Sequence, residues 1–343
     1  MAAAQRRNIS RFIEPFRVTP GKKVTLARDF DPEYVDGGLT RERGEELLAQ
    51  GIELLADYQA RLAAQDTWAV LLCLQALDAA GKDGTIRHVM SGVNPQGVEV
   101  HGFKAPSTEE LDHDYLWRYQ QRLPERGHIG IFNRSHYEEV LVVRVHEDVF
   151  AREKLPRGAR RPGVWKRRYR QINDWERYLV ENGYKVVKLF LNLSKDEQRK
   201  RFLARIDVPE KNWKFSAGDA RERRHWDAYQ KAFSEMLSAT STEWAPWYVI
   251  PADHKWFARI AAAAVLVDTL MTIDPRYPTL PEKELEELAV VKKELEAEGP
   301  PKVSADPDEE APHEEDEEAG EPDGGKKGGK RKKGGKRGKK RKN

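Results

Sequence analysis

A lysine in a glycine-containing loop is the first feature of the sequence whose residue types suggest chemistry. Lys82 follows Gly81, and the apolar run 68–74 before the loop is short enough and β-prone enough to be a buried strand of a parallel sheet. Beyond Gly84, apolar residues recur at helical spacing from Ile86. Backbone N–H groups at the start of such a helix can bind phosphate oxygens. The order of strand, loop and helix therefore predicts a phosphate site.

The loop matches the phosphate-binding motif G-x-x-x-x-G-K-[ST] only in part. Ala76 stands at the first glycine, and Asp83 replaces the hydroxyl residue that normally binds Mg²⁺. Anionic oxygens could still be bound by the Lys82 ammonium and by backbone N–H groups of Ala79, Ala80, Gly81, Lys82, Asp83 and Gly84. A metal would need a carboxylate from elsewhere, and Asp78 is the nearest one. An ordinary turn with a solvated lysine is the alternative.

A second group of polar side chains follows the predicted strand 128–133. Asn133 ends this strand, and Glu138 and Glu139 come about one helical turn later. Acidic residues at the end of a strand beside a phosphate loop often bind the metal of a nucleotide site. Two adjacent glutamates on a solvated surface are the alternative interpretation.

Basic side chains gather on a third segment, a predicted helix that begins at Lys195 with Ser194 as its cap. The helix carries Arg201 and Arg205, and the loop after it carries Lys211 and Lys214. Small-molecule phosphotransferases use such a cationic segment as a lid that closes on the transferring phosphoryl group. The sequence therefore predicts a lid at about 195–225, with a solvated basic helix face as the alternative.

The predicted secondary structure can bring these three segments together. Strands are predicted at 68–74, 98–103, 128–133, 185–193 and 247–250. Helices are predicted at 41–64, 107–122, 165–181, from 195 onward, 217–239 and 256–270. Strands that alternate with helices in this way predict a parallel sheet in a three-layer α/β/α sandwich.

Length and composition limit the kinds of protein that this chain can be. With 343 residues, 39% of them hydrophobic and 34% charged, the chain is long enough for one large α/β domain with appendages. Its one cysteine, Cys73, excludes a disulfide within the chain and fits a reducing cytoplasm. No long apolar segment follows the N-terminus, and no apolar run of transmembrane length is expected. We therefore expect a cytoplasmic protein without a membrane segment.

The appendages differ from the domain in composition. Residues 1–40 lack sustained periodicity and are predicted to be an extended N-terminal arm on a domain at 41–275. Residues 276–298 are predicted to include a charged helix, and 299–343 to be a disordered tail that is first acidic and then rich in Lys and Arg. The net charge of +3 hides this division, because the chain before the basic run 326–342 contains more acids than bases.

Four longer runs resemble the polyphosphate kinase 2 family and, within it, the branch called class III. They are QALDAAGKDGTIRHVMSGVNPQGVEV, FNRSHYEEVLVVRV, LSKDEQRKRFLARIDVPEKNWKFS and TSTEWAPWYVIPADHKWF. The resemblance implies a P-loop kinase-like fold and transfer of the terminal phosphoryl group of inorganic polyphosphate to AMP or ADP. It also implies dependence on Mg²⁺ or Mn²⁺ and a homo-oligomer, often a tetramer, with a dimer as the other possibility.

The resemblance also implies roles for individual residues. Those that match the family's motifs are Asp78 and Lys82 in the loop, Asn133, Arg134, Glu138 and Glu139 after the second strand, and Arg201 in the lid. In these roles Asp78, Glu138 and Glu139 would hold the metal, and Asp78 would also orient the attacking phosphate. Lys82 would hold phosphate, while Arg134, Arg201 and Arg205 would stabilise the transfer.

Polyphosphate is a long polyanion, so its binding requires a basic track. The predicted track consists of the basic residues within 160–168 together with Lys211 and Lys214. His136 lies within the second motif and is predicted to support the site from behind rather than to exchange protons with substrate.

Two other classes of function stay open. An ATP-dependent kinase of a nucleotide or another small molecule would use the same loop and lid. A non-catalytic protein that binds nucleic acid is suggested by the basic tail, which could bind either nucleic acid or polyphosphate.

Deletion of the tail separates these possibilities. If the tail concentrates polyphosphate, removing residues 300–343 is expected to raise the apparent KM for long polyphosphate at low salt, because counterions screen the attraction at high salt. Steady-state kinetics at two ionic strengths measures this, and an unchanged KM would contradict it. A tail that binds nucleic acid predicts salt-dependent retention on DNA instead.

Overall fold

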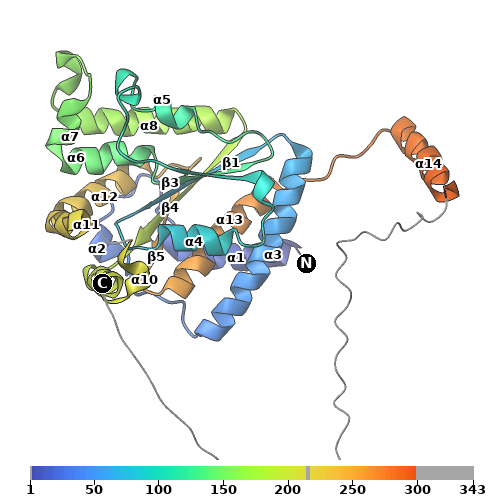
Figure 1. Cartoon of the computed structure of the whole chain (residues 1–343), viewed down its shortest axis with the longest axis horizontal. Helices are drawn as coiled ribbons and strands as arrows, with labels where there is room; N and C mark the ends of the chain where they lie inside the picture. The colour runs from blue at the N-terminus through green and yellow to red at the C-terminus, as the bar shows by residue number, and fades with distance from the viewer. Residues whose placement is uncertain (1, 214–216, 299–343) are drawn as a thin grey trace, which may run out of the picture. The chain divides into compact units, whose positions relative to one another are not determined.

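A parallel sheet of five strands lies at the centre of the domain, in the order β2-β3-β1-β4-β5 (Figure 1). The structure, a computed structural model, describes residues 2–213 and 217–298. The strands are β1 (Ala69–Ala76), β2 (Val98–Gly102), β3 (Ile129–Asn133), β4 (Tyr184–Asn192) and β5 (Trp247–Pro251). The five predicted strands are confirmed to within a few residues. Because β1 lies between β3 and β4, its carboxyl end is flanked by the carboxyl ends of both neighbours.

Helices cover both faces of the sheet, which confirms the predicted three layers (Figure 1). On one face lie α1 (Ala2–Ile13), α3 (Arg41–Gln65), α4 (Lys82–Val89) and α13 (Lys255–Ile273). On the other face lie α5 (Trp117–Gln120), α8 (Val164–Glu181) and α12 (Trp226–Thr240). Successive side chains of β1 enter these two cores in turn: Leu72 packs with the first group and Cys73 with the second.

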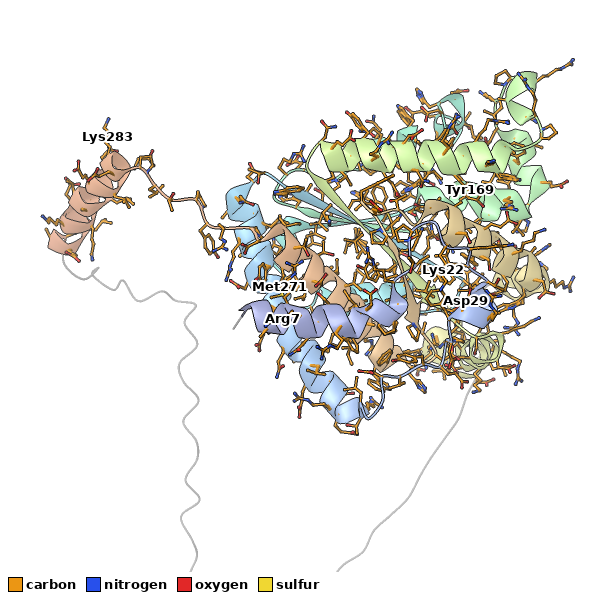
Figure 2. The ribbon with its side chains drawn as sticks, turned by 180° about the vertical axis from the view of Figure 1, so that it is seen from behind. Arg7, Lys22, Asp29, Tyr169, Met271 and Lys283 are labelled. Atoms are coloured by element: carbon orange, nitrogen blue, oxygen red, sulfur yellow. The ribbon has the colours of Figure 1, made fainter. Side chains whose placement is uncertain are left out.

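The prediction of an extended N-terminal arm is wrong at its beginning. Residues Ala2–Ile13 form α1, which packs along α13 (Figure 2). Ile9, Phe12 and Ile13 recur at helical spacing and join the core, with the Phe12 ring 5.9 Å from that of Phe257. Burial of these side chains stabilises a helix whose pattern is too short to stand out in the sequence. The short elements η1 (Glu14–Phe16) and α2 (Leu26–Asp29) follow.

The prediction of one helix at 107–122 is also wrong. The expected capping pair forms, because Ser107 N donates to Glu110 Oε2 at 2.7 Å and Glu110 N donates to Ser107 Oγ at 3.2 Å. Only η3 (Glu110–Asp112) follows, and α5 begins later. Asp114 accepts a hydrogen bond from Leu116 N at 2.9 Å, and such a side-chain turn competes with helix.

Helix α13 is long and apolar enough to cross a membrane by length and composition alone, with a mean hydropathy of 1.6, although no such run was expected. In the structure 67% of this segment is buried inside the domain, which is typical of a core helix. Its contact with α3 is close at Gly44, where an added Cβ would lie 2.7 Å from side-chain atoms of Ile260 and Trp256. A glycine therefore permits this crossing.

The chain divides into two units, Met1–Thr279 and Leu280–Asn343. Within the described part of the second unit, α14 (Glu282–Ala297) confirms the predicted charged helix. The predicted disordered tail at 299–343 lies outside the described residues.

Candidate active site

The predicted phosphate loop connects β1 to α4 with an unusual backbone. Ala79 (φ +66°) and Gly81 (φ +106°) are both in the left-handed region, which glycine adopts readily but which costs an alanine about 1 kcal/mol. Gly81 is the N-cap of α4, so this helix begins at Lys82 and not beyond Gly84 as expected. The N–H groups of the first helical turn therefore belong to the predicted loop and are suited to bind an anion.

The Lys82 ammonium lies across the carboxyl end of β1. Its Nζ donates to the carbonyl oxygens of Ala76 at 2.9 Å and Leu77 at 3.4 Å. Burial lowers the pKa of Lys82, whereas the negative charges of Asp78 and Glu138 raise it. A cation held where water is largely excluded attracts phosphate more strongly than one in bulk solvent.

The end of β3 meets the phosphate loop as expected. Arg134 Nη2 donates to Asp78 Oδ1 at 2.8 Å, and Asn133 Nδ2 donates to Asp83 Oδ1 at 2.7 Å. Arg134 has left-handed backbone (φ +64°), an unfavourable conformation for a side chain of this size. The backbone at Ala79 and at Arg134 is therefore strained on both sides of the same site.

A cavity of about 330 Å³ opens over this cluster. Its polar lining includes Gln75, Asp78, Arg134, Glu138, Gln198, Glu222 and Arg223. Burial raises the pKa of Glu138, which lies in η4 (His136–Val140), although the charges of Arg134 and Lys82 act in the opposite direction. Asp78, Glu138 and Glu222 thus place three carboxylates in one cavity.

The predicted lid forms α9 (Lys195–Asp207), α10 (Pro209–Asn212), α11 (Ala217–Glu222) and η6 (Arg223–His225). The single helix expected at 217–239 is therefore divided into α11, η6 and α12. Gln198 Nε2 donates to the Asp78 carbonyl oxygen at 2.9 Å, and Arg223 Nη1 donates to Gln198 Oε1 at 2.8 Å. These two residues connect the lid to the loop and were missed by sequence reasoning. The basic run around Arg223 lies inside the predicted lid, and it could have indicated that Arg223 contacts the site.

Arg201, predicted to contact the transferring phosphoryl group, is buried behind the loop. All five N–H groups of its guanidinium are used, at 2.6–3.1 Å, by Glu197 Oε1 and by the carbonyl oxygens of Ala79, Ala80, Ala252 and Asp253. In this arrangement Arg201 joins the phosphate loop to the end of β5. It acts here as a positioning residue.

Replacing Arg201 with methionine is therefore expected to destabilise the fold. Four backbone carbonyls and one carboxylate would lose their donor, which should lower the free energy of unfolding by about 3 kcal/mol. Urea denaturation measures this, with Arg199→Met as the matched control because Arg199 is exposed on the same helix. Equal stability of the two variants would contradict the role of Arg201 in joining the phosphate loop to the end of β5.

Two further predicted lid residues, Arg205 and Lys211, do not line this cavity. Arg205 lies against the Phe202 ring, 5.5 Å from its centre, and Lys211 is exposed on α10. Lys214 lies outside the described residues. Their contact with substrate stays a prediction.

The predicted basic track is largely occupied by contacts within its own segment. Arg160 donates to the carbonyl oxygens of Ala151 and Glu153, and Arg161 donates to that of Gly158. Arg167 donates to three further carbonyls, and Arg168 pairs with Glu153 and with the Glu139 carbonyl oxygen. These contacts hold a loop, while Arg160, Arg161 and Lys166 are exposed to solvent, and binding of polyphosphate by this segment stays a prediction.

Glu139 is directed into a second cavity of about 510 Å³. Tyr119 Oη donates to Glu139 Oε1 at 3.0 Å, and the guanidinium groups of Arg118 and Arg168 lie 3.5 and 4.0 Å from its carboxylate. Burial raises the pKa of Glu139 to about 7, with both arginines acting to lower it. Arg134 and Glu138 line this cavity as well as the first, so the two cavities meet at these residues.

The three predicted metal ligands are not brought together. Across residues 2–213 and 217–298, no group of three or more His, Cys, Asp and Glu side chains is arranged to hold an ion. Asp78 and Glu138 share the first cavity, whereas Glu139 pairs with arginines in the second. Metal binding by Asp78 and Glu138 stays a prediction.

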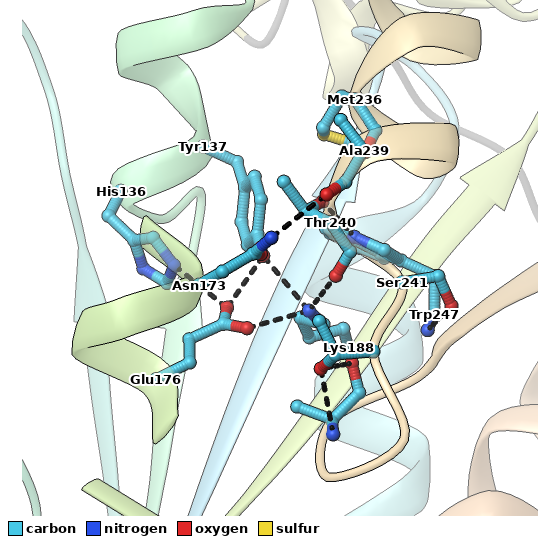
Figure 3. A network of polar contacts seen from close by, with 12 residues as sticks. His136, Tyr137, Asn173, Glu176, Lys188, Met236, Ala239, Thr240, Ser241 and Trp247 are labelled. Atoms are coloured by element: carbon cyan, nitrogen blue, oxygen red, sulfur yellow. Dashed lines mark hydrogen bonds and ion pairs between the residues drawn. The ribbon is translucent and has the colours of Figure 1, made fainter. Parts of the chain in front are cut away.

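A buried polar network supports η4 from behind (Figure 3). Glu176 accepts hydrogen bonds from His136 Nε2 at 3.1 Å, Tyr137 Oη at 2.6 Å and Lys188 Nζ at 2.7 Å. Lys188 also donates to the Thr240 carbonyl oxygen at 2.6 Å. Burial tends to raise the pKa of Glu176, but the charges and hydrogen bonds of Lys188 and His136 together lower it below its usual value. His136 thus holds the segment that carries Glu138, as expected for a supporting residue.

Replacing Lys188 with methionine should leave a buried carboxylate without its cation. We expect the free energy of unfolding to fall by about 3–5 kcal/mol, and the double variant Lys188→Met/Glu176→Gln to recover much of this loss. Guanidinium denaturation of wild type, both single variants and the double variant measures the coupling. Additive effects of the two replacements would show that the pair is not coupled.

Three comparisons with known proteins find relatives of this chain. A family model described as polyphosphate kinase 2 matches residues 38–278. A protein from Rhodopseudomonas palustris named ADP-polyphosphate phosphotransferase is 51% identical over 284 residues, covering 82% of this chain and 97% of that protein. One from Meiothermus ruber named AMP/ADP-polyphosphate phosphotransferase is 44% identical over 281 residues, covering 81% and 100%. The crystal structure of polyphosphate kinase 2 from Arthrobacter aurescens has a TM-score of 0.74 and 42% identity, covering 82% and 96%.

Proposed function

Because the chain belongs to the polyphosphate kinase 2 family, we propose that it transfers the terminal phosphoryl group of inorganic polyphosphate to ADP and AMP. The products are ATP and ADP, and the reverse reaction would lengthen polyphosphate. The observation that carries this proposal is the meeting of Asp78 and Arg134 at one cavity, with the Lys82 ammonium close to Asp78 at the N-terminus of α4. This arrangement suits phosphoryl transfer, in which catalysis consists mainly of positioning and charge stabilisation.

Different side chains contact the donor and the acceptor. In this proposal the Lys82 ammonium and the first N–H groups of α4 bind the donor phosphate. Arg134 stabilises the negative charge on the oxygens of the phosphoryl group during its transfer. The acceptor phosphate is already anionic and needs little help from a base. Asp78, through its ion pair with Arg134, orients the groups around it.

The acceptor nucleotide is proposed to occupy the second cavity. At about 510 Å³ it is large enough for a mononucleotide, and its lining combines apolar side chains such as Phe103 and Tyr115 with Arg118. A nucleoside bound there would direct its phosphate toward Arg134 and Glu138, where the two cavities meet. Arg134 and Glu138 would then border both proposed substrate sites.

Asp78 and Glu138 fit a divalent metal, and we propose Mg²⁺ or Mn²⁺. Both are hard oxygen donors in one cavity, and the Gln75 side chain lies beside them. When bound, such an ion would neutralise negative charge on the phosphate oxygens. A homo-oligomeric state, a cytoplasmic location and polyphosphate binding by the tail belong to the same proposal.

The test is an assay of the full chain with polyphosphate, Mg²⁺ and either ADP or AMP, with products separated by chromatography. ATP from ADP together with ADP from AMP supports the proposal. Product from ADP alone would restrict the acceptors to nucleoside diphosphates. No product with polyphosphate, but consumption of ATP with another acceptor, would favour the ATP-dependent kinase instead.

A further inference from the structure

Helix α14 lies beyond the part of the chain that the family model matches, and its apolar side chains are on the surface. The match ends at residue 278, whereas α14 spans Glu282–Ala297 in the second unit. Within the described residues 280–298 every side chain is exposed. A single helix of this length is only marginally stable in water, so α14 gains stability when its apolar side chains are buried. The large ones are 47–59% exposed and are Leu285, Leu288, Val290, Val291 and Leu295.

Four of these five side chains form one stripe along α14. Leu285, Leu288, Val291 and Leu295 follow at spacings of three, three and four residues, which places them within about 120° of the helix circumference. Leu288 and Leu295 take position a of a heptad repeat, and Val291 takes position d. Val290 points to the opposite side of the helix. Such a stripe is typical of a helix that pairs with another helix.

The charges beside the stripe decide how two such helices can pair. Glu287 and Lys292 flank the stripe on opposite sides, five residues apart along the helix. When two identical helices pair in parallel, this spacing brings Glu287 of one against Lys292 of the partner subunit, twice by symmetry. An antiparallel pair would bring the flank that carries Glu287 and Glu294 against the same flank of the other helix, where like charges repel. The charges therefore select a parallel pair of identical helices.

Two competing contacts of α14 are weak. Lys292 Nζ lies 3.7 Å from Glu296 Oε1 of its own helix, and both side chains are exposed, so this ion pair contributes little and can be exchanged. A membrane surface is the other occupant that an amphipathic helix could have. The helix carries six Glu and three Lys, a net charge of −3, which opposes binding to anionic lipid. A second copy of the chain therefore fits the stripe better than a membrane does.

We propose that α14 pairs in parallel and in register with α14 of a second copy of this chain, with Leu288, Val291 and Leu295 in the core of the pair. This inference deepens the homo-oligomeric state that belongs to the proposed function. Two heptads bury little apolar surface, so the pair strengthens an association of two chains rather than forming it alone. Because α14 lies beyond the matched residues 38–278, loss of the pair should leave phosphoryl transfer unchanged.

The test is disulfide cross-linking of the full chain. Cys73, the one cysteine in the sequence, is buried, so an introduced cysteine reports its own surroundings. In a parallel pair in register, position 295 meets position 295 of the other copy. Under mild oxidation, Leu295→Cys should therefore form an interchain disulfide about tenfold faster than Val290→Cys. Val290→Cys is the matched control because it is equally exposed on the same helix but faces away from the stripe. Non-reducing electrophoresis measures both rates.

The charges are tested in the Leu295→Cys background. Glu287→Lys should slow cross-linking about threefold at low salt, because the new lysine would face Lys292 of the partner subunit. The charge exchange Glu287→Lys/Lys292→Glu should restore the rate, and added salt should reduce the difference between the variants. A rate that the charge exchange leaves as slow as that of the single variant would overturn the parallel orientation.

Equal cross-linking rates for the cysteines at 295 and 290 would overturn the pair, because two helices that are only tethered near each other expose both sides alike. Leu295→Cys that stays monomeric under oxidation would show that another surface covers the stripe. Phosphoryl transfer should equal that of wild type in every variant. If wild type itself shows no transfer, the proposed function fails, and the cross-linking rates still decide whether α14 pairs.

Discussion

Replacing Lys82 with alanine is expected to lower kcat/KM for polyphosphate-dependent ATP formation by about a thousandfold. The reason is the position of the ammonium, which lies at the carboxyl end of β1, close to Asp78 and the first turn of α4, where burial strengthens its attraction for phosphate. Initial rates with ADP at saturating and limiting polyphosphate measure the effect and divide it between kcat and KM.

The stability of this variant is an independent control. Because burial disfavours the charged form of Lys82, its removal should leave the free energy of unfolding unchanged or raise it. Lys231→Ala, at an exposed position of α12, should alter neither rate nor stability. A Lys82→Ala enzyme with more than a tenth of wild-type kcat/KM would show that the loop does not hold the donor phosphate.

Replacing Asp78 with asparagine is expected to lower kcat by about a hundredfold to a thousandfold. This change removes a carboxylate from the cavity that Glu138 also lines and breaks the 2.8 Å ion pair with Arg134, while the shape of the side chain is kept. If Asp78 also helps to hold the metal, the Mg²⁺ concentration for half-maximal rate should rise. Titration of the rate with Mg²⁺ at fixed polyphosphate and ADP measures both effects.

Two results would separate these roles of Asp78. A large loss of kcat with an unchanged Mg²⁺ requirement would restrict Asp78 to positioning Arg134. A wild-type rate would exclude it from the site altogether. Asp227→Asn, exposed on α12, provides the matched control because it makes the same chemical change away from the cavities.

The strands and the meeting of the loop with the end of β3 could be predicted because both depend on local pattern. An apolar run bounded by turn residues forms a strand wherever it can be buried on both faces. The carboxyl ends of neighbouring parallel strands lie at one edge of the sheet, so Lys82 and Arg134 had to come close once β1 and β3 paired. The capping pair at Ser107 formed for the same local reason, yet the helix expected after it did not.

The sequence by itself therefore determined the five strands and the meeting of the phosphate loop with the end of β3. Only the tertiary structure decided what each of those residues can still bind. Arg199 and Arg201 are both cations of α9, but Arg201 uses all its guanidinium N–H groups on carbonyls and a carboxylate, whereas the Arg199 side chain is exposed to solvent. The donors and acceptors that meet a side chain come from distant segments, so its free bonding capacity is a property of the packed fold.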